Sequence, residues 1–367
     1  RRPAEEMTRP LRVFLPRNFH MGDFDALRAF CRVRMHPGER PPSRAAYLRA
    51  VRDAHVLVAM VEDPVDAALM DAAPRLRLAA NFGVGFDNID LPAATARGIL
   101  ATNTPGVVAP PTAECAIALM LAAARRVAEA DAFVRAGRWK AWTPYLLEGR
   151  GLAGRVLGVV GLGGIGSSVA RMARALGMTV RYWSRTRRSP EREAALGARY
   201  RPFRRLLQEA DFLSLHVALH AGTRSLIGEE ELAAMKPGAF LINTARGAVV
   251  DERALVRALR SGHLAGAGLD VYSREPQVPA ALRKMRNVVL LPHLGTSTRE
   301  ARGEMAGRVI RNIRALAAGR RPPDLLNPEA WRPRDPNPAE WPPRGFHPAE
   351  WPPRGFHPAE WKERRGA

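Results

Sequence analysis

Residues 158–170 read GVVGLGGIGSSVA, which places glycines at 161, 163 and 166. An apolar run, RVLGVVG (155–161), precedes these glycines, and a helical pattern follows them. A strand that turns through GxGxxG into a helix is the context of a dinucleotide-binding fingerprint. We expect Gly161 to make the tight turn, Gly163 to let the backbone approach a pyrophosphate, and Gly166 to let the helix pack on the strand. Gly164 and Ile165 complete the turn and open the helix.

The next strand, TVRYWS (179–184), ends in Ser184 and is followed by Arg185, Thr186 and Arg187. An NAD-binding chain usually carries an acidic residue near this point, where it binds the ribose 2′-hydroxyl. A carboxylate is absent here, and the guanidinium groups match the geometry of a 2′-phosphate. The sequence therefore predicts NADP(H) over NAD(H) as the cofactor. The alternative is that one or both of these arginines are simply solvated, which leaves NAD(H) open.

Strand-like and helix-like segments alternate on both sides of this motif, which indicates an α/β fold of doubly wound parallel sheets. We predict two Rossmann-like domains, with the cofactor domain inserted into the substrate domain. The substrate domain is assigned to 1–106 and 294–330, and the NAD(P)-binding domain to 107–293. The predicted strands are 11–16, 55–60, 76–82, 99–102, 155–161, 179–184, 212–217, 239–245, 265–271 and 287–293. The predicted helices include 43–53, 113–135, 251–261 and 297–318.

The C-terminal segment 331–367 differs in character from the rest. The sequence PAEWPPRGFH occurs at 338–347 and again at 348–357, and PAEW recurs from Pro358. Repeats this rich in proline and charge cannot form a packed core, so we predict a disordered tail. Its role stays open between a ligand for a proline-binding module and repeat slippage in the gene.

Composition limits the function classes. The net charge is +21, but the basic residues are almost all arginines spread along the chain, so no nucleic-acid partner is predicted. This charge should attract anionic substrates and cofactor phosphates. Cys31 and Cys115 are too few for a disulfide framework, and no metal site is predicted. No apolar stretch approaches the length of a membrane span, so we predict a cytoplasmic protein without a membrane partner.

Three polar residues follow predicted strands of the second half. Arg246 follows FLINTA, Glu275 follows GLDVYSR, and His293 follows NVVLLP. Ligands of open α/β sheets bind at the carboxyl ends of the strands. We expect Arg246 to hold a substrate carboxylate and polarise a keto group, and His293 to donate a proton. Glu275 would bond the other ring nitrogen and raise the pKa of the histidine.

Residues 10–328 resemble the D-isomer-specific 2-hydroxyacid dehydrogenase family. The resemblance rests on six motifs: NFGVGFDNID (81–90), TNTPGV (102–107), GLGGIG (161–166), LINTARGAVVDE (241–252), AGAGLDVY (265–272) and LLPHLGTST (290–298). YWSRTRR (182–188) is most similar to glyoxylate and hydroxypyruvate reductases. The resemblance supports the three catalytic roles given above and implies a homodimer with Trp139 and Trp142 at the interface. It also implies further site residues: Val84 and Gly85 for the substrate carboxylate, Asp270 for the nicotinamide carboxamide, and Thr112, Val217, Ala245 and Gly295 along the cofactor cleft.

The leading hypothesis is reduction of glyoxylate or hydroxypyruvate to glycolate or D-glycerate. A 2-ketogluconate reductase or a phosphite dehydrogenase of the same family would share the catalytic residues. Asn81 stands where phosphoglycerate-oxidising relatives carry an arginine, which argues against a phosphorylated substrate. An NAD(H)-sensing corepressor of the same fold is the alternative from another class, and Ser184-Arg185 disfavours it.

Overall fold

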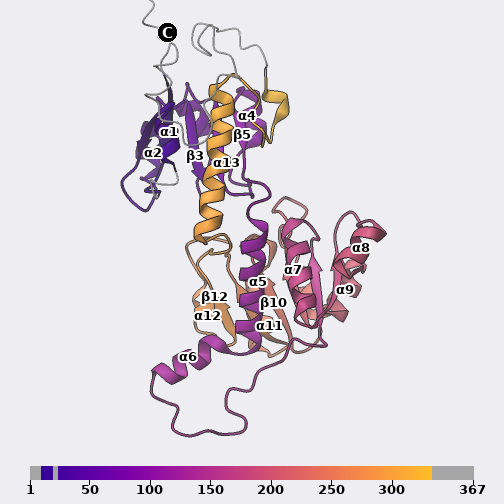
Figure 1. The fold of residues 1–367 in the computed structure, drawn as a ribbon. Coiled ribbons are helices and arrows are strands. Elements are labelled where there is room, and N and C mark those ends of the chain that lie inside the picture. The colour runs from indigo at the N-terminus through magenta and orange to yellow at the C-terminus, as the bar shows by residue number, and fades with distance from the viewer. Residues whose placement is uncertain (1–9, 20–23, 333–367) are drawn as a thin grey trace, which may run out of the picture. The chain divides into compact units, whose positions relative to one another are not determined.

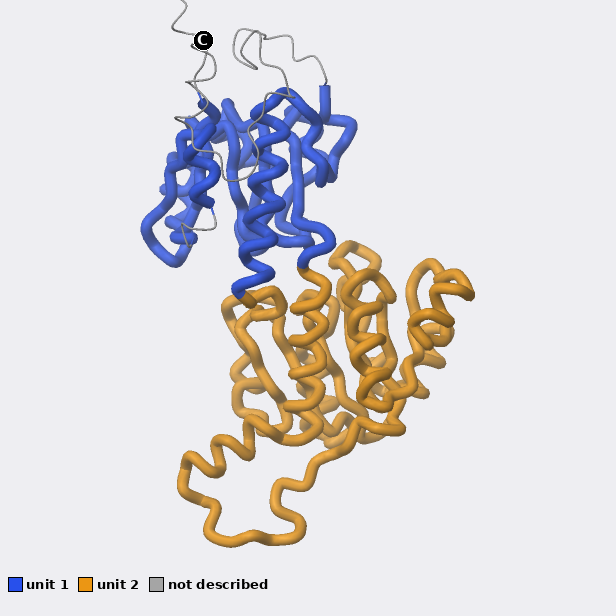
Figure 2. The backbone as a smooth tube through the Cα atoms, viewed as in Figure 1, with its two compact units in different colours: residues 1–107, 299–367 blue, residues 108–298 orange. Residues whose placement is uncertain are grey.

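The computed structural model describes residues 10–19 and 24–332 and divides the chain into two compact units (Figure 2). Unit 1 comprises residues 1–107 and 299–367, and unit 2 comprises residues 108–298. Each unit holds a parallel sheet with helices around it (Figure 1), so the predicted fold class is confirmed, with one domain inserted in the sequence of the other. The repeats from 338 onward lie outside the described residues.

The sheet of unit 1 has the strand order β2-β1-β3-β4-β5. Its strands are β1 (Leu11–Leu15), β2 (Cys31–Met35), β3 (Val56–Met60), β4 (Leu78–Phe82) and β5 (Leu100–Thr102). The helices are α1 (Asp25–Arg28), α2 (Arg44–Val51), α3 (Ala67–Ala72), α4 (Leu91–Ala96) and α13 (Arg299–Ala317), followed by the 3₁₀ turn η4 (Pro328–Ala330). Because the chain starts in the sheet at β1 and adds strands on both sides, the carboxyl ends of β1 and β3 mark its switch point.

The sheet of unit 2 has the order β12-β11-β10-β9-β6-β7-β8. Its strands are β6 (Val156–Val160), β7 (Thr179–Trp183), β8 (Ala198–Tyr200), β9 (Phe212–Leu215), β10 (Ala239–Asn243), β11 (Leu264–Leu269) and β12 (Val288–Leu290). The helices are α5 (Ala109–Ala124), α6 (Val127–Arg135), α7 (Gly164–Ala175), α8 (Pro190–Leu196), α9 (Phe203–Glu209), α10 (Glu229–Ala234), α11 (Glu252–Arg260) and α12 (Ala280–Arg283), with the 3₁₀ turn η3 (Gly247–Val249). The winding direction reverses between β6 and β9, which is where a doubly wound sheet binds its ligand.

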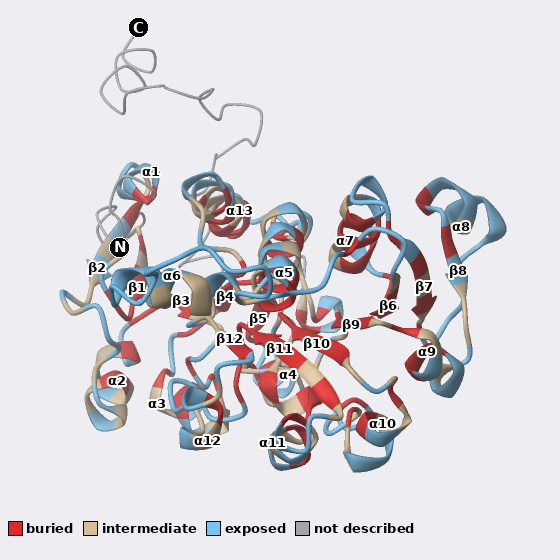
Figure 3. Cartoon of the chain, turned by 90° about the horizontal axis from the view of Figure 1, so that it is seen from below, coloured by how far each residue is buried: buried red, intermediate tan, exposed pale blue. Residues whose placement is uncertain are grey.

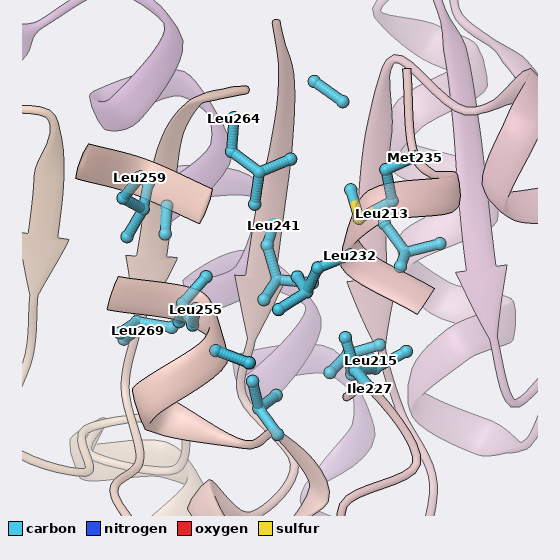
Figure 4. Packing of buried hydrophobic residues seen from close by; sticks show 14 of the residues in the cluster. Leu213, Leu215, Ile227, Leu232, Met235, Leu241, Leu255, Leu259, Leu264 and Leu269 are labelled. Carbon is cyan, nitrogen blue, oxygen red and sulfur yellow. The ribbon is translucent and has the colours of Figure 1, made fainter. Parts of the chain in front are cut away.

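Apolar layers cover both faces of the unit 2 sheet. Leu241 of β10 packs with Leu213 and with α10 and α11 (Figure 4). Its neighbours Phe240 and Ile242 pack on the opposite face with α5 and α7. Successive strand residues point to opposite faces, so burial on both sides requires the nearly continuous apolar runs seen in the sequence. Figure 3 shows the central strands buried and the outer sides of the helices exposed.

The prediction of one helix over 113–135 is wrong. The structure has two helices, α5 and α6, separated at Arg126, which adopts a left-handed φ of 54°. The interruption has no glycine or proline to mark it in the sequence. Arg126 is instead held by its guanidinium, which forms two hydrogen bonds to Glu129 at 2.9 and 3.0 Å.

Two strands escaped sequence analysis, β2 and β8. β2 reads CRVRM, in which arginines alternate with apolar residues, and it lies at an edge of its sheet. β8 has only three residues and also lies at an edge. Such half-exposed or very short edge strands lack the apolar run that identifies a central strand.

Among the described residues, no helix combines the length and apolarity that crossing a bilayer requires.

Candidate active site

The glycine-rich turn lies at the switch point of the unit 2 sheet. Gly161 follows β6 with a φ of 96°, and a Cβ added there would lie 2.6 Å from the carbonyl oxygen of His216. A Cβ at Gly166 would lie 2.1 Å from the carbonyl oxygen of Gly161. Both positions therefore exclude a side chain, the first through backbone conformation and close contact and the second through contact with the turn itself.

The turn leaves space where a pyrophosphate would lie. Gly163 is the N-cap of α7 and has no side chain with which to cap the helix, and a Cβ added to it would meet nothing within 4 Å. Gly164 and Ile165 form the first turn of that helix, whose N–H groups carry the positive end of the helix dipole. This combination of open space and uncapped N–H groups fits the phosphates of a dinucleotide.

The residues after β7 have different partners from those the sequence indicates. Ser184 is buried and donates its hydroxyl hydrogen bond to the carbonyl oxygen of Thr186, at 2.7 Å. The guanidinium of Arg187 binds both carboxylate oxygens of Glu193, at 2.8 and 3.1 Å. Arg188, which the prediction did not include, donates from Nε to the carbonyl oxygen of Leu162 in the glycine-rich turn, at 3.0 Å. Arg185 and Thr186 are exposed.

His293 and Glu275 form a hydrogen-bonded pair at the carboxyl edge of the same sheet. Nδ1 of His293 lies 2.7 Å from Oε2 of Glu275, while Oε1 accepts a hydrogen bond from the backbone N–H of Tyr272. The carboxylate thus holds the ring by one nitrogen and is itself fixed by the chain. Nε2 is left as the ring atom available to a ligand, which is the arrangement a proton donor needs.

The pair shifts both pKa values away from their ordinary ranges. Burial alone would lower the pKa of His293, but the hydrogen bond and charge of Glu275 outweigh it, and the pKa is raised. For Glu275 burial works in the raising direction, and the hydrogen bond and charge of His293 reverse this, so its pKa is lowered. Arg246 contributes to both, since its positive charge lowers the pKa of each partner. At neutral pH the glutamate is therefore ionised and the imidazolium is stabilised.

Asp270 supports the backbone that carries His293. Its two carboxylate oxygens accept hydrogen bonds from the N–H groups of Leu294 and Gly295, at 2.6 and 2.8 Å. Its carbonyl oxygen accepts from the N–H of His293, which has a left-handed φ of 56°. Burial raises the pKa of the Asp270 carboxyl. Asp270 is thus tied to the histidine segment, and its predicted contact with a nicotinamide carboxamide remains a prediction.

Arg246 is oriented by a residue that sequence analysis missed. Asn243, the last residue of β10, donates from Nδ2 to the carbonyl oxygen of Arg246 and accepts from the N–H of Ala245, each at 3.0 Å. The Arg246 guanidinium donates to the carbonyl oxygen of Ala245 at 2.9 Å. The LINTARG motif contains this asparagine, so the turn it forms was readable once the motif was placed at a strand end.

The other predicted cofactor residues lie at the same edge. Val217 packs directly against Gly161, since a Cβ added to that glycine would come within 2.9 Å of the valine. Thr112, in α5, lies beside Gly295, and Ala245 follows β10. Unit 2 therefore brings together the glycine-rich turn and the residues predicted to line the cleft, while their individual roles remain predictions. Val84 and Gly85 follow β4 and belong to unit 1.

A doubly wound sheet with a glycine-rich turn at its switch point, and a histidine–glutamate pair with an arginine at its carboxyl edge, defines the class of nicotinamide-dependent dehydrogenases. A profile of the D-isomer specific 2-hydroxyacid dehydrogenase NAD binding domain matches residues 117–295. Together with the relatives below, this shows that the chain belongs to the D-isomer specific 2-hydroxyacid dehydrogenase family.

Curated relatives span almost the whole described chain. A glyoxylate reductase of Thermococcus litoralis is 48% identical over 320 residues, which cover 86% of this chain and 96% of that protein. A glyoxylate reductase of Aeropyrum pernix is 46% identical over 335 residues, 90% of this chain and 99% of that protein. These values place the chain among the glyoxylate reductase-like members of the family.

Solved structures agree with this placement. A Thermus thermophilus protein superposes with a TM-score of 0.81 at 44% identity, covering 86% of this chain and all of that one. An NADPH-dependent glyoxylate/hydroxypyruvate reductase of Sinorhizobium meliloti, solved with NADP and malonate, superposes with a TM-score of 0.78 at 35% identity. That alignment covers 89% of this chain and 100% of the other.

Proposed function

We propose that the protein reduces glyoxylate or hydroxypyruvate to the corresponding 2-hydroxy acid, glycolate or D-glycerate, with NADPH as the preferred cofactor. The observation that carries the proposal is the hydrogen bond of 2.7 Å between Nδ1 of His293 and Oε2 of Glu275. It produces an imidazolium with a raised pKa and a free Nε2, which are the properties required for protonating an alkoxide. Relatives named as glyoxylate reductases support the substrate class.

Each residue has a definite task in this reaction. A nicotinamide cofactor, when bound at the glycine-rich turn, would supply the hydride for the keto carbon. His293 gives the proton on Nε2 to the keto oxygen as negative charge develops there, and Glu275 stabilises the imidazolium beforehand. Arg246 binds the substrate carboxylate and polarises the keto group through its fixed positive charge. Val84 and Gly85 bind the carboxylate through their backbone N–H groups.

The preference for NADPH rests on the arginines after β7. Nε and Nη2 of Arg187 both donate to the carboxylate of Glu193, so this guanidinium is less suited to bind a phosphate than one without such a partner. Arg188 reaches the glycine-rich turn, and Arg185 directly follows the buried Ser184. We assign the 2′-phosphate contacts to Arg185 and Arg188, with Arg187 and Glu193 shaping the segment around them.

Initial rates test the proposal directly. NADPH and NADH are each combined with glyoxylate, hydroxypyruvate, pyruvate and 2-ketogluconate. We expect the highest kcat/KM with NADPH and with glyoxylate or hydroxypyruvate. His293→Ala should lower kcat by about 10² or more while leaving NADPH binding unchanged, because the lost group acts only on the keto oxygen. Full turnover by this variant would refute the proton-donor role, and a preference for 2-ketogluconate would refute the substrate.

A homodimer is part of the proposal. α6 and the segment that follows it, residues 127–150, extend away from the rest of unit 2 (Figure 1), and we call them the arm. Trp142 is 77% exposed and Tyr145 81% exposed, and Trp139 is exposed as well. Large aromatic side chains gathered on one projection are typical of an interface. The cytoplasmic location predicted from the sequence stays a prediction.

A further inference from the structure

Unit 1 contains a run of peptide groups whose carbonyl oxygens accept hydrogen bonds from the protein, while their N–H groups donate none within the described part of the chain. The run, which we call the amide loop, comprises residues 83–86 and directly follows β4. The carbonyl oxygen of Gly83 accepts from the backbone N–H of Thr104 at 3.1 Å. The carbonyl oxygen of Val84 accepts from Nδ2 of Asn103 at 2.8 Å, and that of Gly85 accepts from Nδ2 of Asn81 at 2.6 Å. Every carbonyl of these peptide groups is therefore bound from the protein side.

The N–H groups of the same peptides point away from these partners and have no acceptor among the described residues. A trans peptide is planar, so its N–H points away from its C=O. Fixing the carbonyls of Gly83, Val84 and Gly85 thus directs the N–H groups of Val84, Gly85 and Phe86 to the other side. None of these three N–H groups donates a hydrogen bond to another described residue. Successive unpaired N–H groups on one side of a turn form a concave site for an anion.

The orientation of the asparagine that holds Gly85 follows from its own neighbours. Asn88 donates from Nδ2 to the carbonyl oxygens of Met60 and Asp63, both at 3.0 Å, so this atom must be its nitrogen. The same nitrogen lies 3.1 Å from Oδ1 of Asn81, which fixes that atom as an acceptor. Nδ2 of Asn81 must then face Gly85. Asn81 is fully buried, which makes this network stiff.

We propose that Asn81 and Asn103 are positioning residues for the substrate carboxylate. Their side-chain amides bind the backbone of the amide loop from behind, so that the N–H groups of Val84, Gly85 and Phe86 are presented together to a carboxylate. Binding an anion this way costs little reorganisation, because the donors are already directed. Gly83 permits the arrangement, since a Cβ there would lie 2.3 Å from Cγ1 of Val61.

The inference deepens the proposed function and rests on it only in that the ligand carries a carboxylate. The test measures kcat and KM for glyoxylate, KM for NADPH, and the Kd of oxamate, an unreactive carboxylate, by calorimetry with the cofactor present. In Asn103→Ala we expect the KM for glyoxylate and the Kd of oxamate to rise about ten-fold. The kcat and the KM for NADPH should stay within about two-fold, because proton transfer and cofactor binding do not use the amide loop.

Asn312→Ala is the matched control. Asn312 is also fully buried in unit 1, where it binds Arg308 and Asp324 rather than the amide loop. We expect this variant to lose thermal stability while keeping the KM for glyoxylate. Asn103→Asp provides a second variant of almost unchanged shape that has lost the donor, and it should weaken oxamate binding at least as much as the alanine.

The outcomes separate the inference from the proposed function. Folded Asn103 variants with an unchanged KM for glyoxylate and an unchanged Kd for oxamate would overturn the inference and leave the proposed function intact. A wild-type protein that reduces neither glyoxylate nor hydroxypyruvate, yet binds oxamate in a way that depends on Asn103, would overturn the proposed function and support the inference.

Discussion

In the reaction that we propose, His293 is the proton donor, and its contacts within unit 2 suit it to that role. Its backbone is held in a left-handed conformation by Asp270, and its ring is held by Glu275. The pKa of the imidazole is raised, so the protonated form persists to higher pH than in an ordinary histidine. Reduction consumes this proton. The rate of reduction should therefore be full below the raised pKa and decline as the pH rises through it.

The change Glu275→Gln tests this coupling. The amide keeps the shape of the side chain but removes the charge that raises the pKa of His293, so that burial and Arg246 then dominate and lower it. We expect the alkaline limb of the kcat profile for reduction to move to lower pH by roughly one unit or more. Steady-state rates between pH 5 and 9 measure the shift. Glu229→Gln is the control, because Glu229 forms an exposed ion pair with Arg257 and does not contact His293. An unmoved limb would show that Glu275 does not set this pKa.

At this scale the sequence predicted candidate catalytic residues, whose roles remain predictions, and missed much of the hydrogen bonding that supports them. Arg246, Glu275 and His293 could be proposed because each lies in the segment that follows an apolar strand. Asn243 lies in the LINTARG motif, but neither it nor Asn103 was predicted as a supporting residue, because an asparagine that binds a carbonyl oxygen leaves no periodic or compositional mark. The different partners of Arg187 and Arg188 depend on Glu193, which lies six residues after Arg187 in α8, and the sequence alone does not show which arginine this glutamate binds.

Among the elements, the segment after β7 carries a prediction of its own. Arg188→Ala should raise the KM for NADPH about ten-fold and leave that for NADH nearly unchanged, because one charge-assisted contact to the 2′-phosphate is lost. Arg187→Ala should change the ratio of the two cofactors far less, since this guanidinium already binds Glu193. Initial rates with both cofactors at fixed keto acid give the ratio. A larger effect at Arg187 than at Arg188 would reverse our assignment.

The elements themselves were predicted best where burial is greatest. Central strands such as β6, β10 and β11 are apolar on both faces, so their runs stand out without knowledge of their neighbours. The break between α5 and α6 was missed for the opposite reason. It depends on the left-handed Arg126 and its ion pair with Glu129, and neither disrupts the helical pattern of the sequence.

At the scale of the whole molecule, the arm is the part of unit 2 that does not pack into the hydrophobic core of that unit. α6 has no buried residue among its nine, and Val127 and Val134 on it are more than half exposed. The chain returns to the body of the unit at Arg150, whose N–H donates to the carbonyl oxygen of Ala124 at 2.8 Å. In the homodimer that we propose, a second copy of the chain would cover this apolar surface with the same arm by symmetry.

The double change Trp142→Glu with Tyr145→Glu tests this assignment. Two carboxylates in an apolar interface would have to be desolvated without partners, so we expect the dimer to dissociate into folded monomers. Light scattering on a sizing column reports the mass, and thermal melting reports the fold. Leu176→Glu, an exposed leucine at the end of α7 outside the arm, is the control and should leave the dimer intact. If the wild-type protein is a monomer, or if the double variant is still a dimer, the arm is not the interface. Turnover by the resulting monomers would further show that each chain reduces keto acids without a side chain from its partner.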